Sequence, residues 1–352
     1  MSSPLPRPGL RDVAPYVSPQ LDVAARLNTN ECPSSLPKAY YDDLASAVRH
    51  LPLHRYPDGQ AGHLREELAR CTGHELGING TWVANGSNEI LTQLLEAYGG
   101  PGRRAITFEP TYLLHSRLCW LTQTDVERRR LPKNFVLTER QVDEAADAHP
   151  DIVFVCSPNN PTGNAQPVAV VQSLAARLPT ALIVVDEAYV EFGGDSALSC
   201  VTAQPNVVVV RTFSKAFALA GVRIGYALTS PDVVSDLQRV RLPYHLSSLT
   251  QTAGIVALRH RDEANALLGA IRVQRDRIID ELGSLAGVTA YPSDANFVLF
   301  VPEDDATRVW RALLARGVLV RDISHVVPNA LRVTAGAEHE VDLFLKALRE
   351  VL

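Results

Sequence analysis

Three apolar runs of the sequence each end in polar residues that could do chemistry. The runs are short and rich in β-branched residues, which is typical of strands buried on both faces of a mostly parallel sheet. Ligands of such sheets bind beyond the carboxyl ends of the strands, so polar residues that follow the strands are expected to converge. After the runs that end at Cys156, Val185 and Val210, these residues are Asn160, Asp186, Tyr189 and Lys215.

Each of these residue types has a role in the chemistry of a pyridine aldehyde. A lysine whose pKa is lowered can attack the aldehyde and form a Schiff base. A buried carboxylate such as Asp186 keeps a pyridine nitrogen protonated, which turns the ring into an electron sink. Tyr189 and Asn160 could hydrogen-bond the ring hydroxyl and tune the pKa of the Schiff base. We therefore predict Lys215, Asp186, Tyr189 and Asn160 as catalytic residues.

A second group of residues is suited to the phosphate of such a cofactor. A helix is expected to begin near Glu89, and its N-terminus offers free backbone N–H groups and the positive end of a dipole. Beyond Lys215, the guanidinium of Arg223 can bind a phosphate in a fork, and the glycines that flank it allow close backbone approach. The candidate phosphate ligands are Gly86, Ser87, Asn88, Thr212, Ser214 and Arg223.

Each of these residues has a commonplace explanation when it is taken alone. An aspartate such as Asp186 is most often a helix cap or a surface ion-pair partner, and Lys215 alone would be a surface lysine. Ser87 alone would be an N-cap. Their joint occurrence at the strand ends, in this order, favours a cofactor site.

The elements that would position these residues alternate along positions 38–260. Amphipathic stretches such as Glu89–Tyr98 alternate with apolar runs, which also occur at 105–108 and 225–228. This pattern predicts a large α/β domain whose mostly parallel sheet lies between helices. Positions 1–37 are rich in proline and lack periodicity, so we interpret them as an arm that must lie on another surface.

The last part of the chain, 261–352, predicts a smaller α+β domain. It begins with a long helical pattern at Asp262–Leu282, with Gly283 as the helix stop. Strands are expected near Asn296–Val301, Val318–Arg321 and Leu331–Thr334, and helices at 306–316 and 338–351. Two domains agree with the length of 352 residues, because single cores stop growing at about 250–300 residues.

Composition excludes several classes of function. The chain has 34 Lys and Arg residues and 39 Asp and Glu residues, so its net charge is slightly negative. We see no basic patch that would bind nucleic acid. The short basic run Arg128–Arg130 is interpreted as a solvent-exposed face. No apolar run has the length of a membrane span, and the proline-bearing N-terminus is not a signal peptide. The five cysteines have neither metal-ligand spacing nor a disulfide framework, so we expect no metal and a reduced, cytoplasmic setting.

Several stretches of the chain resemble fold type I pyridoxal-phosphate aminotransferases, and most of all the histidinol-phosphate aminotransferase family. The stretches are RLNTNE (26–31), HRYPD (54–58), ANGSNEIL (84–91), SPNNPTG (157–163), VDEAY (185–189), FSKAF (213–217), RLPYHLSS (241–248), PSDANF (292–297) and VRD (320–322). They cover nearly the whole chain. The resemblance implies pyridoxal 5'-phosphate on Lys215, and a seven-stranded, mostly parallel sheet beside a small α+β domain.

The resemblance also implies roles that spacing alone could not assign. Tyr112 would stack on the pyridine ring, and Tyr56 would reach across a homodimer interface to the partner's cofactor phosphate. The substrate residues would be Arg332 and Arg321 at its anionic end, and Tyr16 and Asn30 of the arm as its cover. Without the resemblance, the simplest interpretation is that Arg332 forms an ion pair between the domains and that Tyr16 is an aromatic residue packed within the arm. Family members commonly have Asn-Pro where this chain has Cys32 and Pro33, which predicts a cover of different shape.

The activity that the resemblance implies is amino transfer between L-histidinol phosphate and 2-oxoglutarate, giving imidazole acetol phosphate and L-glutamate, in histidine biosynthesis. The alternatives are an aromatic amino acid aminotransferase and a phosphothreonine-type decarboxylase on the same scaffold. A cofactor-sensing regulator would need a DNA-binding segment, and the arm is too short and proline-rich to hold one. The sharp turn expected at Asn160 also predicts a cis Asn160–Pro161 bond, since only X–Pro bonds adopt cis at low cost.

Overall fold

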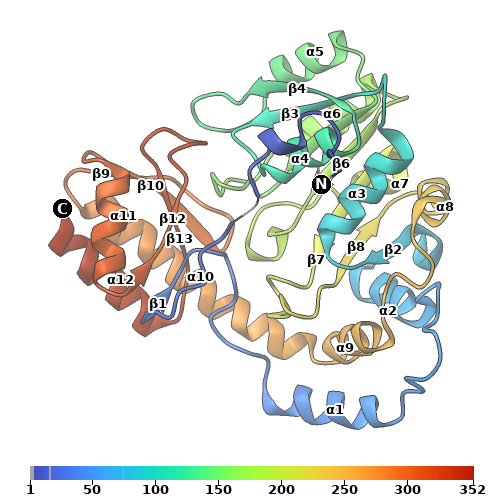
Figure 1. Ribbon diagram of the computed structural model, residues 1–352, viewed down its shortest axis with the longest axis horizontal. Coiled ribbons are helices and arrows are strands. Elements are labelled where there is room, and N and C mark those ends of the chain that lie inside the picture. Colours follow the sequence, from blue (N-terminus) through green and yellow to red (C-terminus); the bar gives the residue numbers. More distant parts are fainter. Residues whose placement is uncertain (1–3, 16, 74) are drawn as a thin grey trace.

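A seven-stranded sheet forms the centre of the larger part of the chain (Figure 1). The computed structural model describes residues 4–15, 17–73 and 75–352. The strands follow the order β2-β8-β7-β6-β5-β3-β4, and every neighbouring pair is parallel except the two that involve β8. Their bounds are β2 (Thr81–Ala84), β3 (Arg104–Glu109), β4 (Asp125–Arg130), β5 (Ile152–Cys156), β6 (Leu182–Asp186), β7 (Val207–Thr212) and β8 (Gly225–Leu228). The predicted fold class is confirmed.

Helices cover both faces of this sheet, which explains why its central strands are apolar throughout. In β6, Ile183 and Val185 join one apolar cluster, whereas Leu182 and Val184 join the cluster on the opposite face. The first cluster includes residues of α1 (Lys38–Arg49), α2 (Gly62–Thr72), α5 (Glu139–Asp147), α6 (Val168–Arg177), α7 (Leu198–Ala203) and α9 (Ser248–Arg259). The second includes residues of α3 (Ser87–Tyr98), α4 (Leu114–Leu121) and α8 (Pro231–Val240). A strand buried on both faces needs this uninterrupted apolar pattern.

A smaller antiparallel sheet follows in the last part of the chain, in the order β12-β13-β10-β9. Its strands are β9 (Val288–Ala290), β10 (Phe297–Pro302), β12 (Arg321–Asp322) and β13 (Leu331–Thr334). Its apolar cluster is shared with α10 (Arg261–Ser284), α11 (Ala306–Ala315) and α12 (Glu338–Val351). Figure 1 shows α10 running from the foot of the larger part to the smaller sheet.

The N-terminal arm lies along both parts of the molecule (Figure 1). It carries a short 3-10 helix, η1 (Leu10–Asp12), and then β1 (Ala25–Arg26), which pairs in parallel with β11 (Val318–Leu319) of the last part. Two further 3-10 helices, η2 (Gly77–Gly80) and η3 (Val190–Phe192), precede β2 and follow β6. The arm therefore gains its order from backbone pairing with a distant segment.

Some elements differ from those predicted. The single strand expected at Val318–Arg321 is divided, because β11 pairs with the arm and β12 pairs with β13. The helix expected to stop at Gly283 continues to Ser284. The sequence pattern did not reveal β2 or β4; β4 is an edge strand whose polar residues, including exposed Arg128 and Arg130, form no apolar run.

None of the helices in the described part of the chain combines the length and apolar character that a membrane crossing requires. Within the same residues, His, Cys, Asp and Glu side chains do not gather into a group that could hold a metal ion.

Candidate active site

A cavity of about 540 Å³ lies between the carboxyl ends of β5, β6 and β7 and the strands β12 and β13 of the smaller sheet. The N-terminus of α3, the segment 111–117, the loop after β12 and a segment of the arm complete its walls. The predicted site residues that line it are Asn30, Ser87, Asn88, Tyr112, Asn160, Asp186, Tyr189, Thr212, Ser214, Lys215, Arg223, Arg321 and Arg332. The convergence expected at the strand ends is thus present, and the smaller sheet contributes two arginines to it.

Lys215 is the amine of this cavity. Its Nζ donates a hydrogen bond to the carbonyl of Thr29, at 3.0 Å. Burial lowers the pKa of Lys215 to about 7, and the positive charges of Arg332 and Arg223 also lower it while Glu31 opposes them. An amine with this pKa is largely uncharged just above neutral pH, which is the form that attacks an aldehyde.

Asp186 is the buried carboxylate of the cavity, and only 2% of its surface is exposed. Its Oδ2 lies 3.1 Å from Nε2 of His115, and its Oδ1 accepts a hydrogen bond from the backbone N–H of Ala188. His115 is itself fully buried, with its ring stacked on Phe154 at 4.9 Å between centroids. The imidazole therefore fixes the direction of the carboxylate.

Tyr189 and Asn160 are both held by side chains that are distant in sequence. The hydroxyl of Tyr189 accepts a hydrogen bond from Asn30 Nδ2 at 3.0 Å, and burial raises the pKa of Tyr189 to about 12. Arg332 donates to Asn160 Oδ1 at 2.7 Å and to the carbonyl of Asn28 at 2.9 Å. The Asn160–Pro161 peptide bond is cis, as predicted.

A cradle of backbone and hydroxyl groups lies beside Lys215, at the start of α3. Arg223, which has a positive φ of 60°, donates to Ser214 Oγ at 3.1 Å. A Cβ atom at Gly86 would lie 2.5 Å from Arg223 Nη2, and one at Gly225 would lie 2.2 Å from the backbone N of Ser87. Glycine is therefore required where β8 and α3 meet, and the cradle combines a cation, hydroxyls and a helix N-terminus. This donor set fits a phosphate group.

The remaining predicted residues are placed as follows. Tyr112 lies edge-on to His115, at 5.5 Å between ring centroids, and donates to Asn88 Oδ1 at 3.4 Å. Arg321 reaches Ser18 Oγ of the arm at 3.3 Å. Gly86 does not line the cavity, although its backbone contacts Arg223. Tyr16 falls outside the described residues.

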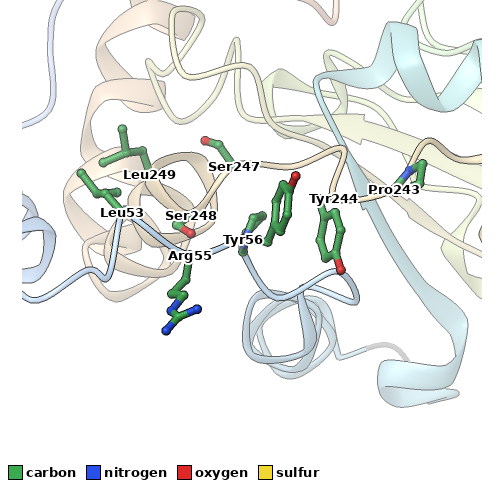
Figure 2. Close-up of a pocket in the computed structure, with 9 residues that line it drawn as sticks. Leu53, Arg55, Tyr56, Pro243, Tyr244, Ser247, Ser248 and Leu249 are labelled. Atoms are coloured by element: carbon green, nitrogen blue, oxygen red, sulfur yellow. The ribbon is translucent and has the colours of Figure 1, made fainter.

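Tyr56 does not approach the cavity of its own chain. It is 80% exposed, and its ring stacks on Tyr244 with centroids 4.4 Å apart and planes 9° from parallel. Figure 2 shows the two rings face to face in a separate surface hollow, with Leu53 and Leu249 nearby.

The profile of the family described as aminotransferase class I and II matches residues 24–349. The chain belongs to this family. A histidinol-phosphate aminotransferase of Frankia casuarinae is 46% identical, with 98% of this chain and 90% of the relative covered. One of Thermobifida fusca is 45% identical, with 97% and 94% covered. The solved histidinol-phosphate aminotransferase of Sinorhizobium meliloti, in complex with pyridoxal-5'-phosphate, is 26% identical with a TM-score of 0.87 and covers 99% of this chain and 98% of its own.

The sequence analysis did not identify several residues that line the cavity of this aminotransferase or orient a side chain within it. His115 follows Tyr112 by about one helical turn, but no motif marks it as a partner of Asp186. Thr29 contributes a backbone carbonyl, which any residue could supply. The other lining residues that were missed include Asn28, Thr111, Arg117, Cys156 and His325.

The lowered pKa of Lys215 predicts selective acylation of this aminotransferase in its cofactor-free form. At pH 8, about nine in ten Lys215 amines would be neutral, against less than about 1% of ordinary lysines. Acetic anhydride at limiting concentration should therefore label Lys215 ahead of the exposed Lys133 and Lys346, as measured by peptide mass spectrometry. Labelling of Lys215 no faster than these two at pH 8 would contradict the lowered pKa.

Proposed function

We propose that this aminotransferase exchanges the amino group of L-histidinol phosphate with 2-oxoglutarate, giving imidazole acetol phosphate and L-glutamate, in histidine biosynthesis. The observation that carries the proposal is identity of 45–46%, over nearly the full length of both chains, to proteins named histidinol-phosphate aminotransferase. These names favour neither an aromatic amino acid aminotransferase nor a phosphothreonine-type decarboxylase.

The cofactor is pyridoxal 5'-phosphate, which supplies an aldehyde and a protonated ring that accepts negative charge from the substrate. The groups suited to its ring are Tyr112, Asn160, Asp186 and Tyr189. Those suited to its phosphate are Gly86, Ser87, Asn88, Thr212, Ser214 and Arg223. The close approach of Arg223 to Gly86 and of Gly225 to the backbone of Ser87, which leaves no room for a Cβ, brings the cation to the N-terminus of α3 and supports the phosphate assignment.

Three side chains perform the proton chemistry in this proposal. Lys215, with its pKa lowered to about 7, would hold the cofactor through its aldehyde as the neutral amine, and it could then take a proton from the substrate carbon that bears the amino group. The Asp186 carboxylate, oriented by His115, would accept the N–H of the pyridine ring and hold that proton. The hydroxyl of Tyr189, which accepts from Asn30, would donate to the ring oxygen.

Arginine side chains that line the cavity are the proposed ligands for the anionic end of either substrate. Arg332 and Arg321 come from adjacent strands of the smaller sheet, β13 and β12. Arg117 and His325 line the same cavity. A phosphate monoester and a dicarboxylate share this requirement for positive charge and multiple donors. Asn30 and Tyr16 of the arm are the proposed substrate cover.

Substrate preference tests the proposal directly. The enzyme loaded with pyridoxal 5'-phosphate is mixed with L-histidinol phosphate, L-phenylalanine or O-phosphothreonine, and loss of the cofactor's visible absorbance is followed. We expect histidinol phosphate to react fastest.

The Lys215→Ala variant should remain folded but show no turnover, because the attacking amine is absent. The substrate comparison has its own contradicting outcome. Faster reaction with phenylalanine, or release of carbon dioxide from phosphothreonine, would overturn the proposed substrate.

The proposed working unit is a homodimer in which Tyr56 reaches the partner's cofactor phosphate. Tyr56 is largely exposed and lies outside the cavity of its own chain. The exposed side chains of Leu53, Tyr244 and Leu249 line the same surface hollow as Tyr56. Burial of such a surface against a second copy would be favourable. A twofold pair would complete both sites at once.

Complementation tests this shared site. Lys215→Ala is mixed with Tyr56→Ala, and after subunit exchange the mixed dimer contains one site with both groups intact. Activity should rise well above that of either parent. The control pairs Lys215→Ala with Asp186→Ala, whose groups belong to one cavity, so no site is restored. Equal activity in the two mixtures, with exchange verified by mass spectrometry, would mean that Tyr56 does not serve the partner.

Two further expectations remain predictions. One is the division of the chain into an N-terminal arm and small-domain segment at 1–37, a large domain at 38–260 and a small domain at 261–352. The other is the cytoplasmic location.

A further inference from the structure

Arg275 lies outside the cavity, and none of the chemistry described above uses it. It belongs to α10, and its side chain is 11% exposed. Its Nη1 donates to the carbonyl of Phe192 at 3.1 Å and to that of Ala295 at 3.4 Å, while its Nε contacts the Asp276 carboxylate at 2.8 Å. One guanidinium thus bridges two segments: the end of η3 and the segment before β10.

The first segment leads to the ring of Tyr189. This residue directly precedes η3, and its carbonyl accepts the backbone N–H of Phe192 at 3.0 Å. Although η3 follows a strand of the large sheet, Tyr189 and Phe192 are both buried in the apolar cluster of the smaller sheet. The ring of Tyr189 lies edge-on to Phe297, at 5.1 Å between centroids. A second arginine of α10, Arg272, also donates to the carbonyl of Phe192, at 3.0 Å.

The second segment leads to the hydroxyl of the same tyrosine. Asn296, which follows Ala295 and is fully buried, donates from Nδ2 to the carbonyl of Asn30 at 3.1 Å. Asn30 in turn donates to the hydroxyl of Tyr189 at 3.0 Å. The ring of Tyr189 and the donor to its hydroxyl are therefore anchored to the two segments that Arg275 joins.

The two segments also touch directly. A Cβ atom at Gly193 would lie 3.0 Å from the carbonyl oxygen of Asp294 and 3.2 Å from its Cα. Both contacts are tighter than ordinary packing, so the backbones pass each other with no room for a side chain between them. A small separation of the segments would move the ring of Tyr189 relative to Asn30.

We propose that Arg275 is a positioning residue, which orients Tyr189 toward the cofactor by holding η3 and the segment before β10 together. The inference rests on the proposed binding of pyridoxal 5'-phosphate. Both bonds come from the one nitrogen Nη1, whose two N–H groups have directions fixed by the guanidinium plane. The ammonium of lysine has three N–H groups but rotates freely on a flexible stem, so it does not fix these directions. The effect of Arg275 on the cofactor is transmitted through the tyrosine hydroxyl.

A pH titration of the bound cofactor's visible absorbance tests this role. Arg275→Met removes the donors and keeps the apolar stem, whereas Arg275→Lys keeps the charge. A hydroxyl that donates to the ring oxygen favours the form in which that oxygen is negatively charged, so displacement of Tyr189 should raise the midpoint. We expect a rise of roughly half a pH unit or more for Arg275→Met and a smaller rise for Arg275→Lys.

The same titration in a Tyr189→Phe background separates positioning from a merely structural role. Adding Arg275→Met to Tyr189→Phe should give no further shift, because the hydroxyl that carries the effect is already absent. The control is Arg277→Met, on the same helix, whose guanidinium pairs with Asp342 of α12; its midpoint should equal that of the wild type.

An equal shift in both backgrounds, or no shift in Arg275→Met, would overturn the inference while the proposed function stands. If Arg275→Met does not fold, Arg275→Lys decides, and a wild-type midpoint for that variant overturns the inference. A wild-type chain that gains no visible absorbance with pyridoxal 5'-phosphate would instead contradict the proposed function, and the inference with it.

Discussion

The amine of Lys215 and the carboxylate of Asp186 are buried in one cavity but do not form an ion pair with each other. The proposed chemistry depends on their remaining unpaired. Lys215 donates to the carbonyl of Thr29, whereas Asp186 is held by His115 and a backbone N–H. No ion pair joins the two within the described part of the chain. Such a pair would stabilise the charged lysine; instead, burial and the charge of Arg332 lower its pKa to about 7. The proposed function requires this arrangement, because it uses the amine as a nucleophile and the carboxylate as the partner of a pyridine nitrogen.

The two sheets and the arm each supply different residues to the cavity. Parallel strands β5, β6 and β7 end at one edge, which brings Asp186, at the end of β6, and Lys215, just after β7, to the same cavity. The smaller sheet supplies Arg332, whose side chain reaches back to Asn160 and to the arm. The arm is ordered by its pairing with β11 and carries Asn30 to the hydroxyl of Tyr189. The cavity is therefore complete only when all three parts of the chain have packed together.

The sequence predicted the groups whose positions follow from local pattern. Apolar runs mark β5, β6 and β7, so the sequence alone predicts that Asp186 and Lys215 lie at or just beyond strand ends. It could not predict contacts set by tertiary packing: His115 reaches Asp186 from a helix without a distinguishing motif, and β4 lies at an edge where polar residues hide the strand. The splitting of 318–322 between two sheets depends on the arm, which has no periodic pattern. For Tyr56, a single chain shows only an exposed ring that lies outside the cavity.

The central claim is that the buried Asp186 carboxylate makes the bound cofactor an effective acceptor of negative charge. The most direct measurement is kcat/KM of Asp186→Ala with L-histidinol phosphate, compared with the wild type at equal cofactor occupancy. Removal of a preorganised electrostatic partner should lower kcat/KM by on the order of 10²-fold or more. A value near that of the wild type would contradict the account.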